Sequence, residues 1–194
     1  MQKWIVSALA AAFVGLAALP AAAQAPKDFG ISIGVQAPPI AGTTQDGKPA
    51  TFADLKGQKG LVIAFVRSAD WCPFCKQQLK DLNTIAGDLD ARGFKLVALS
   101  YDSVETLAKF AKSSKIAYTL LSDPRSTVID AFGIRNMDVV GNKRMDGIPH
   151  PAIYVISADG MILDKLYEES YRKRPPADVV LKAVDAALMK LPKS

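Results

Sequence analysis

Residues 61–75 read Leu-Val-Ile-Ala-Phe-Val-Arg-Ser-Ala-Asp-Trp-Cys-Pro-Phe-Cys, and this stretch points to the fold class. It opens with an apolar run, residues 61–66, whose length and composition predict a central strand covered on both faces. It closes with Cys72 and Cys75, the two cysteines of the whole chain, just before a segment of helical periodicity. A Cys-x-x-Cys at a strand-to-helix junction is typical of a dithiol redox site.

The order of the two cysteines suggests different roles. A helix that begins after Cys72 directs unpaired backbone N–H groups and its positive dipole end at that sulfur. Such surroundings favour the thiolate, with thiol pKa values of roughly 3.5–7.5. Pro73 fits the first helical position, where a missing N–H costs nothing. We therefore expect Cys72 to attack and Cys75 to resolve the mixed disulfide, with Trp71 shielding one side of the pair.

Two other roles for the cysteines, a structural disulfide and a zinc site, fit the sequence less well. A purely structural disulfide is disfavoured, because a four-residue loop restricts the unfolded chain much less than a long loop does. A structural zinc site needs four ligands, whereas the chain has two cysteines and one histidine. We therefore expect no metal and no cofactor other than the redox-active disulfide itself.

The first 23 residues have the pattern of a signal peptide. Lys3 supplies the positive start, residues 4–19 are apolar, and Ala21-Ala22-Ala23 follows Pro20. An uncleaved membrane anchor is the alternative, because the apolar run is about long enough to span a bilayer. The Ala-x-Ala ending favours cleavage, export to the periplasm or another extracytoplasmic compartment, and no stable membrane insertion afterwards. An exported cysteine pair is oxidised unless a donor reduces it.

The rest of the chain is divided into a flexible leader at residues 24–36 and one domain at residues 37–191. The formal net charge is +5, from 24 basic and 19 acidic residues, and it falls to +4 without Lys3. These charges are scattered along the sequence, and no nucleic-acid-binding motif accompanies them. We therefore expect no nucleic-acid partner.

The predicted elements alternate between strand and helix before ending in a hairpin and a helix. A hairpin turn is expected at residues 45–48, followed by strands at 61–66, 94–100, 118–121, 152–157 and 161–167. Leu79, Leu82, Ile85 and Leu89 form one apolar face, which predicts a single helix that ends near Gly93. Further helices are expected from residue 104, at 126–132 and from residue 177. This order predicts an α/β fold with a mixed central sheet flanked by helices.

Several short motifs, in this order and spacing, resemble one family of thiol proteins. They are Ala37-Pro38, residues 52–57, residues 71–75, Leu121-Ser122-Asp123-Pro124, Phe132-Gly133-Ile134 and residues 147–156. Over about residues 34–190 the chain resembles the thioredoxin fold and, more narrowly, the alkyl hydroperoxide reductase/thiol-specific antioxidant (peroxiredoxin-like) redoxins. The resemblance implies a thioredoxin-like domain with a redoxin-type N-terminal extension and oxidoreductase activity. It also implies protein thiols or disulfides, a dithiol electron donor and hydroperoxides as partners.

Pro151 is the position where two branches of this resemblance diverge. Thioredoxin-like proteins carry a cis proline immediately before the strand that faces the cysteines, so the resemblance implies a cis Pro151 packed against the disulfide. Peroxiredoxins usually carry an arginine there, and its absence favours dithiol–disulfide exchange over peroxide reduction. The register from residue 62 points the other way, because it places Cys72 at the peroxiredoxin threonine and Cys75 at the peroxidatic cysteine.

Three polar residues near the motif are weaker candidates. Arg67, at the strand end, is expected either to stabilise a thiolate or to be a solvated charge. His150 is expected to line the substrate groove, to assist proton transfer or to lie in solvent. Asp70 is expected to be a solvated loop charge, with a role as proton acceptor for Cys75 as the alternative.

The leading hypothesis is an exported thiol–disulfide oxidoreductase, with a thiol-dependent peroxidase as the first alternative. A non-enzymatic binding module is the second alternative. It is motivated by Ala64, which stands where many relatives have a buried acid, and by the missing arginine.

Overall fold

The structure is a computed structural model that describes residues 29–168, 170 and 172–191. The predicted signal peptide and residues 24–28 of the leader lie outside the described residues. Within the described ranges, none of the helices combines the length and apolar character needed to cross a bilayer.

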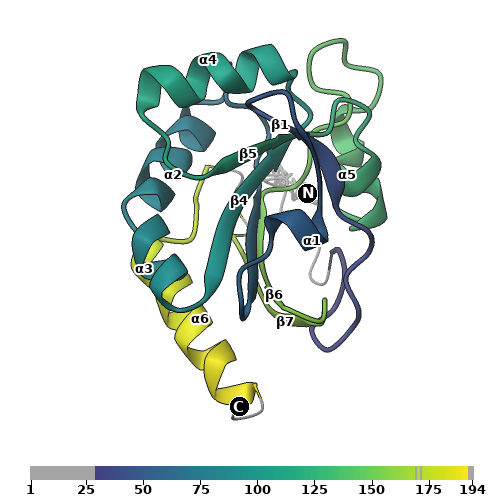
Figure 1. Ribbon diagram of the computed structural model, residues 1–194. Helices are drawn as coiled ribbons and strands as arrows, with labels where there is room; N and C mark the ends of the chain where they lie inside the picture. Colours follow the sequence, from purple (N-terminus) through teal and green to yellow (C-terminus); the bar gives the residue numbers. More distant parts are fainter. Residues whose placement is uncertain (1–28, 169, 171, 192–194) are drawn as a thin grey trace, which may run out of the picture.

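One seven-stranded mixed sheet forms the centre of the domain, in the order β2-β1-β5-β4-β3-β6-β7 (Figure 1). β3, β4 and β5 run parallel, and the other neighbouring strands pair antiparallel. The strands are β1 (Ala41–Thr44), β2 (Pro49–Thr51), β3 (Gly60–Phe65), β4 (Phe94–Ser100), β5 (Thr119–Ser122), β6 (Ala152–Ser157) and β7 (Ile162–Tyr167). The predicted α/β class, the mixed sheet and the hairpin turn at residues 45–48 are confirmed.

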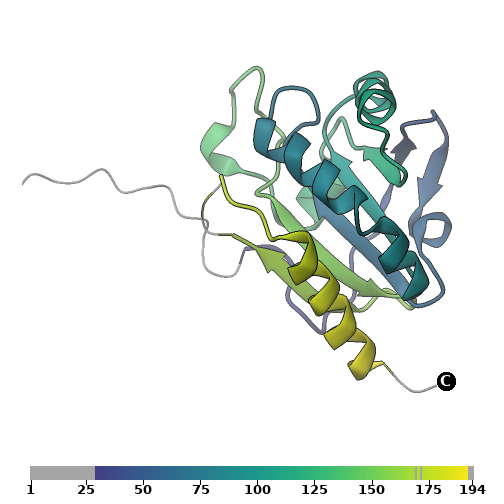
Figure 2. The same ribbon diagram turned by 90° about the vertical axis from the view of Figure 1, so that its left-hand side faces the viewer.

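Helices cover both faces of the sheet. They are α1 (Phe52–Leu55), α2 (Pro73–Asn83), α3 (Ala86–Ala91), α4 (Val104–Ser114), α5 (Thr127–Ala131) and α6 (Ala177–Lys190), with a 3₁₀ turn η1 (Met137–Val139). On one face α2, α3, α4 and α6 share a core with Val62 and Ala64 of β3 (Figure 2). On the other face α1 and α5 pack against Leu61, Ile63 and Phe65 of the same strand. Because alternate residues of β3 serve the two cores, all six are buried, as the apolar run predicts.

The single helix predicted after the cysteines is wrong, because it is broken into α2 and α3. The hydroxyl of Thr84 donates to the carbonyl of Asp81 at 2.7 Å. The backbone N–H groups of Thr84 and Ile85 also bond three residues back, to Asp81 and Leu82. These bonds tighten the turn and end α2. The apolar face survives the break, since Leu82 and Leu89 are both fully buried.

Residues 29–36, predicted above as part of a flexible leader, instead pack on the fold. The N–H of Gly34 donates to the carbonyl of Ile162 at 2.8 Å, and the N–H of Ile162 returns a bond to Val35 at 3.0 Å. Phe29 is buried, with its ring 4.8 Å from that of Tyr167 and 5.4 Å from that of His150. The segment is held because it offers β7 backbone partners and one aromatic anchor, which its polar composition does not reveal.

Candidate active site

Cys72 and Cys75 form a disulfide at the start of α2, where the chain leaves the carboxyl end of β3. Cys72 is the N-cap residue, and its sulfur accepts the backbone N–H of Cys75 at 3.1 Å. Pro73 occupies the first turn without losing a hydrogen bond, as predicted. Both cysteines are fully buried. The two sulfurs therefore lie at the positive end of a helix and away from bulk solvent.

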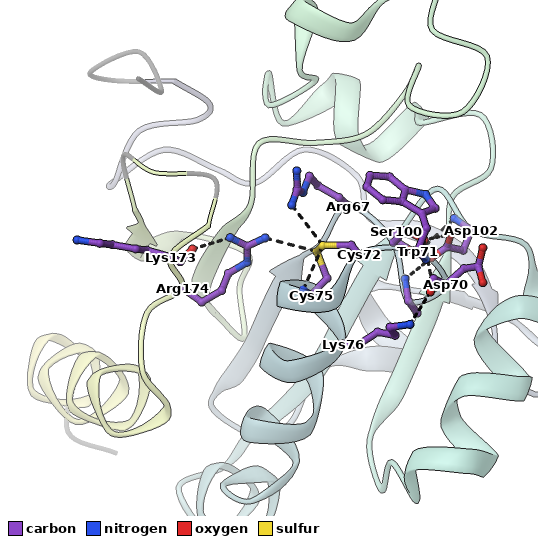
Figure 3. The surroundings of a disulfide bond; sticks show 12 residues. Arg67, Asp70, Trp71, Cys72, Cys75, Lys76, Ser100, Asp102, Lys173 and Arg174 are labelled. Atoms are coloured by element: carbon purple, nitrogen blue, oxygen red, sulfur yellow. Dashed lines mark hydrogen bonds between the residues drawn. A yellow bond between two sulfur atoms is a disulfide. The ribbon is translucent and has the colours of Figure 1, made fainter. Parts of the chain in front are cut away.

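Two guanidinium groups reach the pair, one for each sulfur (Figure 3). Nη2 of Arg67 donates to Sγ of Cys72 at 3.4 Å, which supports its predicted place beside the thiol. Nη2 of Arg174 donates to Sγ of Cys75, also at 3.4 Å, from the segment that leads into α6. Burial and the positive charge of Arg67 lower the pKa of Arg174 to about 10, so Arg174 stays protonated at neutral pH. Cationic donors of this kind stabilise a thiolate over a thiol.

Trp71 lies beside the pair and links it to the loop around η1. Its ring packs between two cations, with Cζ of Arg67 at 5.7 Å and Cζ of Arg144 at 5.6 Å from the ring. The indole N–H donates to the hydroxyl of Tyr101 at 2.8 Å, and that hydroxyl donates to the carbonyl of Arg144 at 2.5 Å. Trp71 is half-buried, so it covers part of the site while keeping a polar contact.

Asp102 is a buried carboxylate behind the loop that carries the motif. It accepts the hydroxyl of Ser68 at 2.8 Å, the backbone N–H of Ala69 at 2.7 Å and the hydroxyl of Ser100 at 2.8 Å. Burial raises its pKa above the ordinary value, although these hydrogen bonds oppose the shift. The exposed Asp70 lies in the same loop, with a carboxylate oxygen 3.9 Å from Nη2 of Arg144, and so is the surface charge that the sequence predicts.

The cis peptide bond expected at Pro151 is wrong, because no peptide bond in the described residues is cis. The chain approaches β6 already extended. Pro149 forms a bridge with Arg135, and the N–H of His150 donates to the carbonyl of Ile134 at 2.7 Å. A trans bond continues this extended path into β6. The cis geometry that the thioredoxin-type resemblance implies for Pro151 is therefore not found.

His150 packs in an aromatic cluster. Its half-buried ring lies against Phe29, 5.4 Å between ring centres, and burial lowers its pKa below the ordinary value. The His150 ring therefore contacts Phe29 at the start of the described residues.

The structure also brings in residues that the sequence analysis did not select. Arg174 is 99 positions from Cys75, and Asp102 is 34 positions from Ser68. A signal for Asp102 is its place two residues after the predicted strand 94–100, because the carboxyl ends of parallel neighbouring strands meet at one edge of a sheet. No pattern in the sequence places Arg174 beside the cysteines.

Comparison with known proteins gives a consistent result. The family model described as the AhpC/TSA family matches residues 33–165. Peroxiredoxin Bcp of Escherichia coli K12 is 32% identical over 126 residues, which are 65% of this chain and 79% of that protein. The chloroplastic peroxiredoxin Q of Sedum lineare is 26% identical over 156 residues, covering 80% of this chain and 79% of that one.

Solved structures agree at the level of the fold. Peroxidoxin BcpB of Mycobacterium tuberculosis superposes with a TM-score of 0.69 at 23% identity, over 82% of this chain and 98% of that one. Peroxiredoxin Q of Xanthomonas campestris gives a TM-score of 0.63 at 25% identity, over 76% and 90% of the two chains. The thioredoxin-like, peroxiredoxin-type fold is thereby confirmed.

Proposed function

This chain belongs to the AhpC/TSA family, and from that premise we propose that it reduces hydroperoxides through Cys72 and Cys75. Its enzyme class is oxidoreductase acting through cysteine thiols, so the reading as a non-enzymatic binding module is set aside. The main support for the proposal is that the guanidinium groups of Arg67 and Arg174 each donate a hydrogen bond to one sulfur. They supply the cationic environment that a peroxide-reducing thiolate needs, from positions other than residue 151.

In the reduced enzyme, Cys72 is the attacking thiolate. In the disulfide form that the structure shows, its sulfur accepts the N–H of Cys75 and the guanidinium of Arg67, whereas Arg174 is the donor to Cys75. The Cys72 thiolate attacks the terminal oxygen of a hydroperoxide, the O–O bond breaks, and the alcohol leaves after taking up a proton. The resulting sulfenic acid is attacked by the sulfur of Cys75, which releases water and forms the disulfide.

A dithiol donor closes the cycle. Its thiolate attacks one sulfur of the disulfide, a mixed disulfide forms, and the second donor thiol resolves it and leaves oxidised donor and reduced enzyme. Thiol–disulfide exchange, the leading hypothesis from sequence, is thus retained as the reductive half of a peroxidase cycle. The cysteine pair is the redox group throughout.

We also propose that the chain is exported, on the strength of residues 1–23. Outside the cytoplasm the disulfide is the resting form, so turnover there depends on a dedicated dithiol donor.

The cysteines can be separated by experiment. Wild type, Cys72→Ser and Cys75→Ser are reduced, mixed with hydrogen peroxide in a stopped-flow instrument, and analysed by mass spectrometry after a sulfenic-acid trap. We expect Cys75→Ser to consume one equivalent of peroxide and to accumulate a trapped sulfenic acid at Cys72, whereas Cys72→Ser reacts at least a hundredfold more slowly. The reverse pattern would move the attack to Cys75, as the peroxiredoxin register implies. Slow peroxide consumption by the wild type would overturn the proposed function.

A further inference from the structure

The loop between β3 and α2 keeps one backbone bond to the sheet, from the N–H of Val66 to the carbonyl of Leu99 in β4, and beyond it the loop is held by two side chains. Its backbone N–H groups at Ala69, Asp70 and Trp71 all point to side-chain oxygens. The first donates to a carboxylate oxygen of Asp102 at 2.7 Å. The other two donate to the hydroxyl oxygen of Ser68, at 2.9 Å and 3.3 Å. Since Ser68 in turn donates to Asp102, one carboxylate anchors the whole loop that ends at Cys72.

Asp102 is itself firmly fixed. It follows Ser100 at the end of β4 and is 8% exposed. The hydroxyl of Ser100 donates to its carboxylate at 2.8 Å, and the hydroxyl of Ser122, from β5, donates to its backbone carbonyl at 2.6 Å. Three donors therefore converge on the carboxylate, and each requires an acceptor. An amide in its place would turn an NH₂ group toward at least one of these donors.

The residue before Asp102 holds the other end of the loop. The hydroxyl of Tyr101 accepts the indole N–H of Trp71. Tyr101 and Asp102, which are consecutive residues after β4, therefore contact the two ends of the segment 68–71. Figure 3 shows Asp102 and Ser100 on the side of the disulfide opposite Arg174. The sulfurs thus lie between the guanidinium of Arg174 on one side and the buried carboxylate of Asp102 on the other.

We propose that Asp102, acting through Ser68, is a positioning residue that holds Cys72 within reach of Arg67 and of the α2 N–H groups. Only the effect on peroxide reduction rests on the proposed function. The position of the Cys72 sulfur relative to its hydrogen-bond donors can be tested without it. Arg67 belongs to the same loop, directly before Ser68, so a loop that shifts changes the position of the sulfur relative to its cation. Loss of the anchor raises the Cys72 thiol pKa, because the thiolate loses donors that stabilise it.

The test pairs Asp102→Asn with Asp123→Asn as the matched control. Asp123 is equally buried, at 5% exposure, and its carboxylate accepts the N–H groups of Thr127, Val128 and Ile129 at the start of α5. Both variants exchange a buried carboxylate with backbone donors for an amide. The donors to Asp102 include the loop before Cys72, whereas the donors to Asp123 belong to the start of α5.

Two readouts are independent of peroxidase activity. One is the Cys72 thiol pKa, measured by thiolate absorbance in a Cys75→Ser background, and the other is the reduction potential of the Cys72–Cys75 pair. For Asp102→Asn we expect the thiol pKa to rise by about one unit, which lowers the thiolate population about tenfold at pH values below that pKa. The potential should shift as well, and the peroxide rate constant should fall with the thiolate population. For Asp123→Asn we expect a lower melting temperature with an unchanged thiol pKa and potential.

An unchanged pKa and potential in Asp102→Asn, or equal changes in both variants, would overturn the proposal. If Asp102→Asn does not fold, Ser68→Ala replaces it, since that change keeps the carboxylate and its bond to Ala69, but removes the hydroxyl that donates to Asp102 and accepts from Asp70 and Trp71. It should raise the Cys72 pKa in the same direction by a smaller amount, and a folded Ser68→Ala with an unchanged pKa would equally refute the inference. A wild type that fails to reduce peroxide but shows the expected pKa response would refute the proposed function and leave this inference intact.

Discussion

The two sulfurs of the pair have different electrostatic partners, although they are joined to each other. Cys72 accepts a helix N–H and the guanidinium of Arg67, and Cys75 accepts the guanidinium of Arg174. A charge-assisted hydrogen bond is worth about 1.5–3 kcal/mol, so each guanidinium acts mainly on the sulfur that it contacts. The two arginines should therefore control different halves of the catalytic cycle.

We expect Arg174→Gln to raise the Cys75 thiol pKa by about one unit and to slow reduction of the disulfide, because Cys75 is the thiolate released when a donor attacks Cys72. Oxidation by peroxide should slow much less. Arg67→Gln should instead slow oxidation by peroxide more than it slows reduction of the disulfide. The two half-reactions are followed separately by tryptophan fluorescence in single-turnover experiments. Arg172→Gln, an exposed arginine two residues from Arg174, is the control, and identical profiles for Arg67→Gln and Arg174→Gln would contradict this division of roles.

At the scale of residues, the sequence predicted what is local and missed what is distant. Cys72, Pro73 and Arg67 lie within one short segment, where spacing alone places the first two at a helix start and Arg67 just after a strand. Arg174 and Asp102 come from other elements, and their contacts depend on how the chain returns to the site. Pro151 was misjudged for a related reason. Its peptide bond follows the pairing of residues 134–136 with 148–150, which no local pattern reveals.

At the scale of elements, residues 29–36 and β7 form a unit closed by aromatic side chains. The ring of Phe29 lies between those of His150 and Tyr167, and Nζ of Lys165 donates to the backbone carbonyl of Phe29 at 3.0 Å. The elements themselves were largely predictable, because residues 94–100 form a mostly apolar run of strand length and helical periodicity marks the segments 104–114 and 177–190. The break at Thr84 and the docking of Phe29 were not, since each depends on single hydrogen bonds or on one ring.

This unit should loosen in mild acid. Burial lowers the pKa of His150 below 6.5, with the charge of Asp138 opposing the shift, so the unfolded chain binds the proton more readily than the folded one. The contribution of neutral His150 is fully present above pH 6.5 and is lost as the pH falls from there through the folded pKa. We expect the urea midpoint to drop between pH 7.5 and 5.5 more steeply in the wild type than in His150→Gln. Amide exchange at Gly34 and Ile162 should accelerate in parallel, and a steeper drop in the variant would contradict the assignment.

At the scale of the whole molecule, one sheet separates two cores, and the site lies where the chain passes from the sheet to the helical face. β3 contributes to both cores and delivers the motif directly, so displacement of the site would disturb packing on both faces. The site is thus supported by a strand whose residues are all buried, while its cations come from the loop after β3 and from the segment before α6.

Export is the prediction that concerns the whole chain. Expressed from its full sequence in a bacterium with a general secretion system, the protein should appear outside the cytoplasm with Gln24 as its first residue. Cell fractionation with mass determination of the purified protein checks this. Ala23→Lys should leave the precursor unprocessed, because signal peptidase needs a small residue at that position. A full-length chain that stays in the cytoplasm would disprove export.

The two outer strands of the sheet are both unsuited to accept another chain. β2 has three residues and begins with Pro49, which has no N–H to donate. β7 is already occupied at its start by Gly34 and Val35, and it carries the charged pair Asp164 and Lys165 beyond that point. Within the described residues the sheet therefore offers no long apolar margin for edge-to-edge aggregation or for strand addition. A donor protein must recognise the side chains around Cys72, such as the exposed ring of Phe74, instead of extending the sheet.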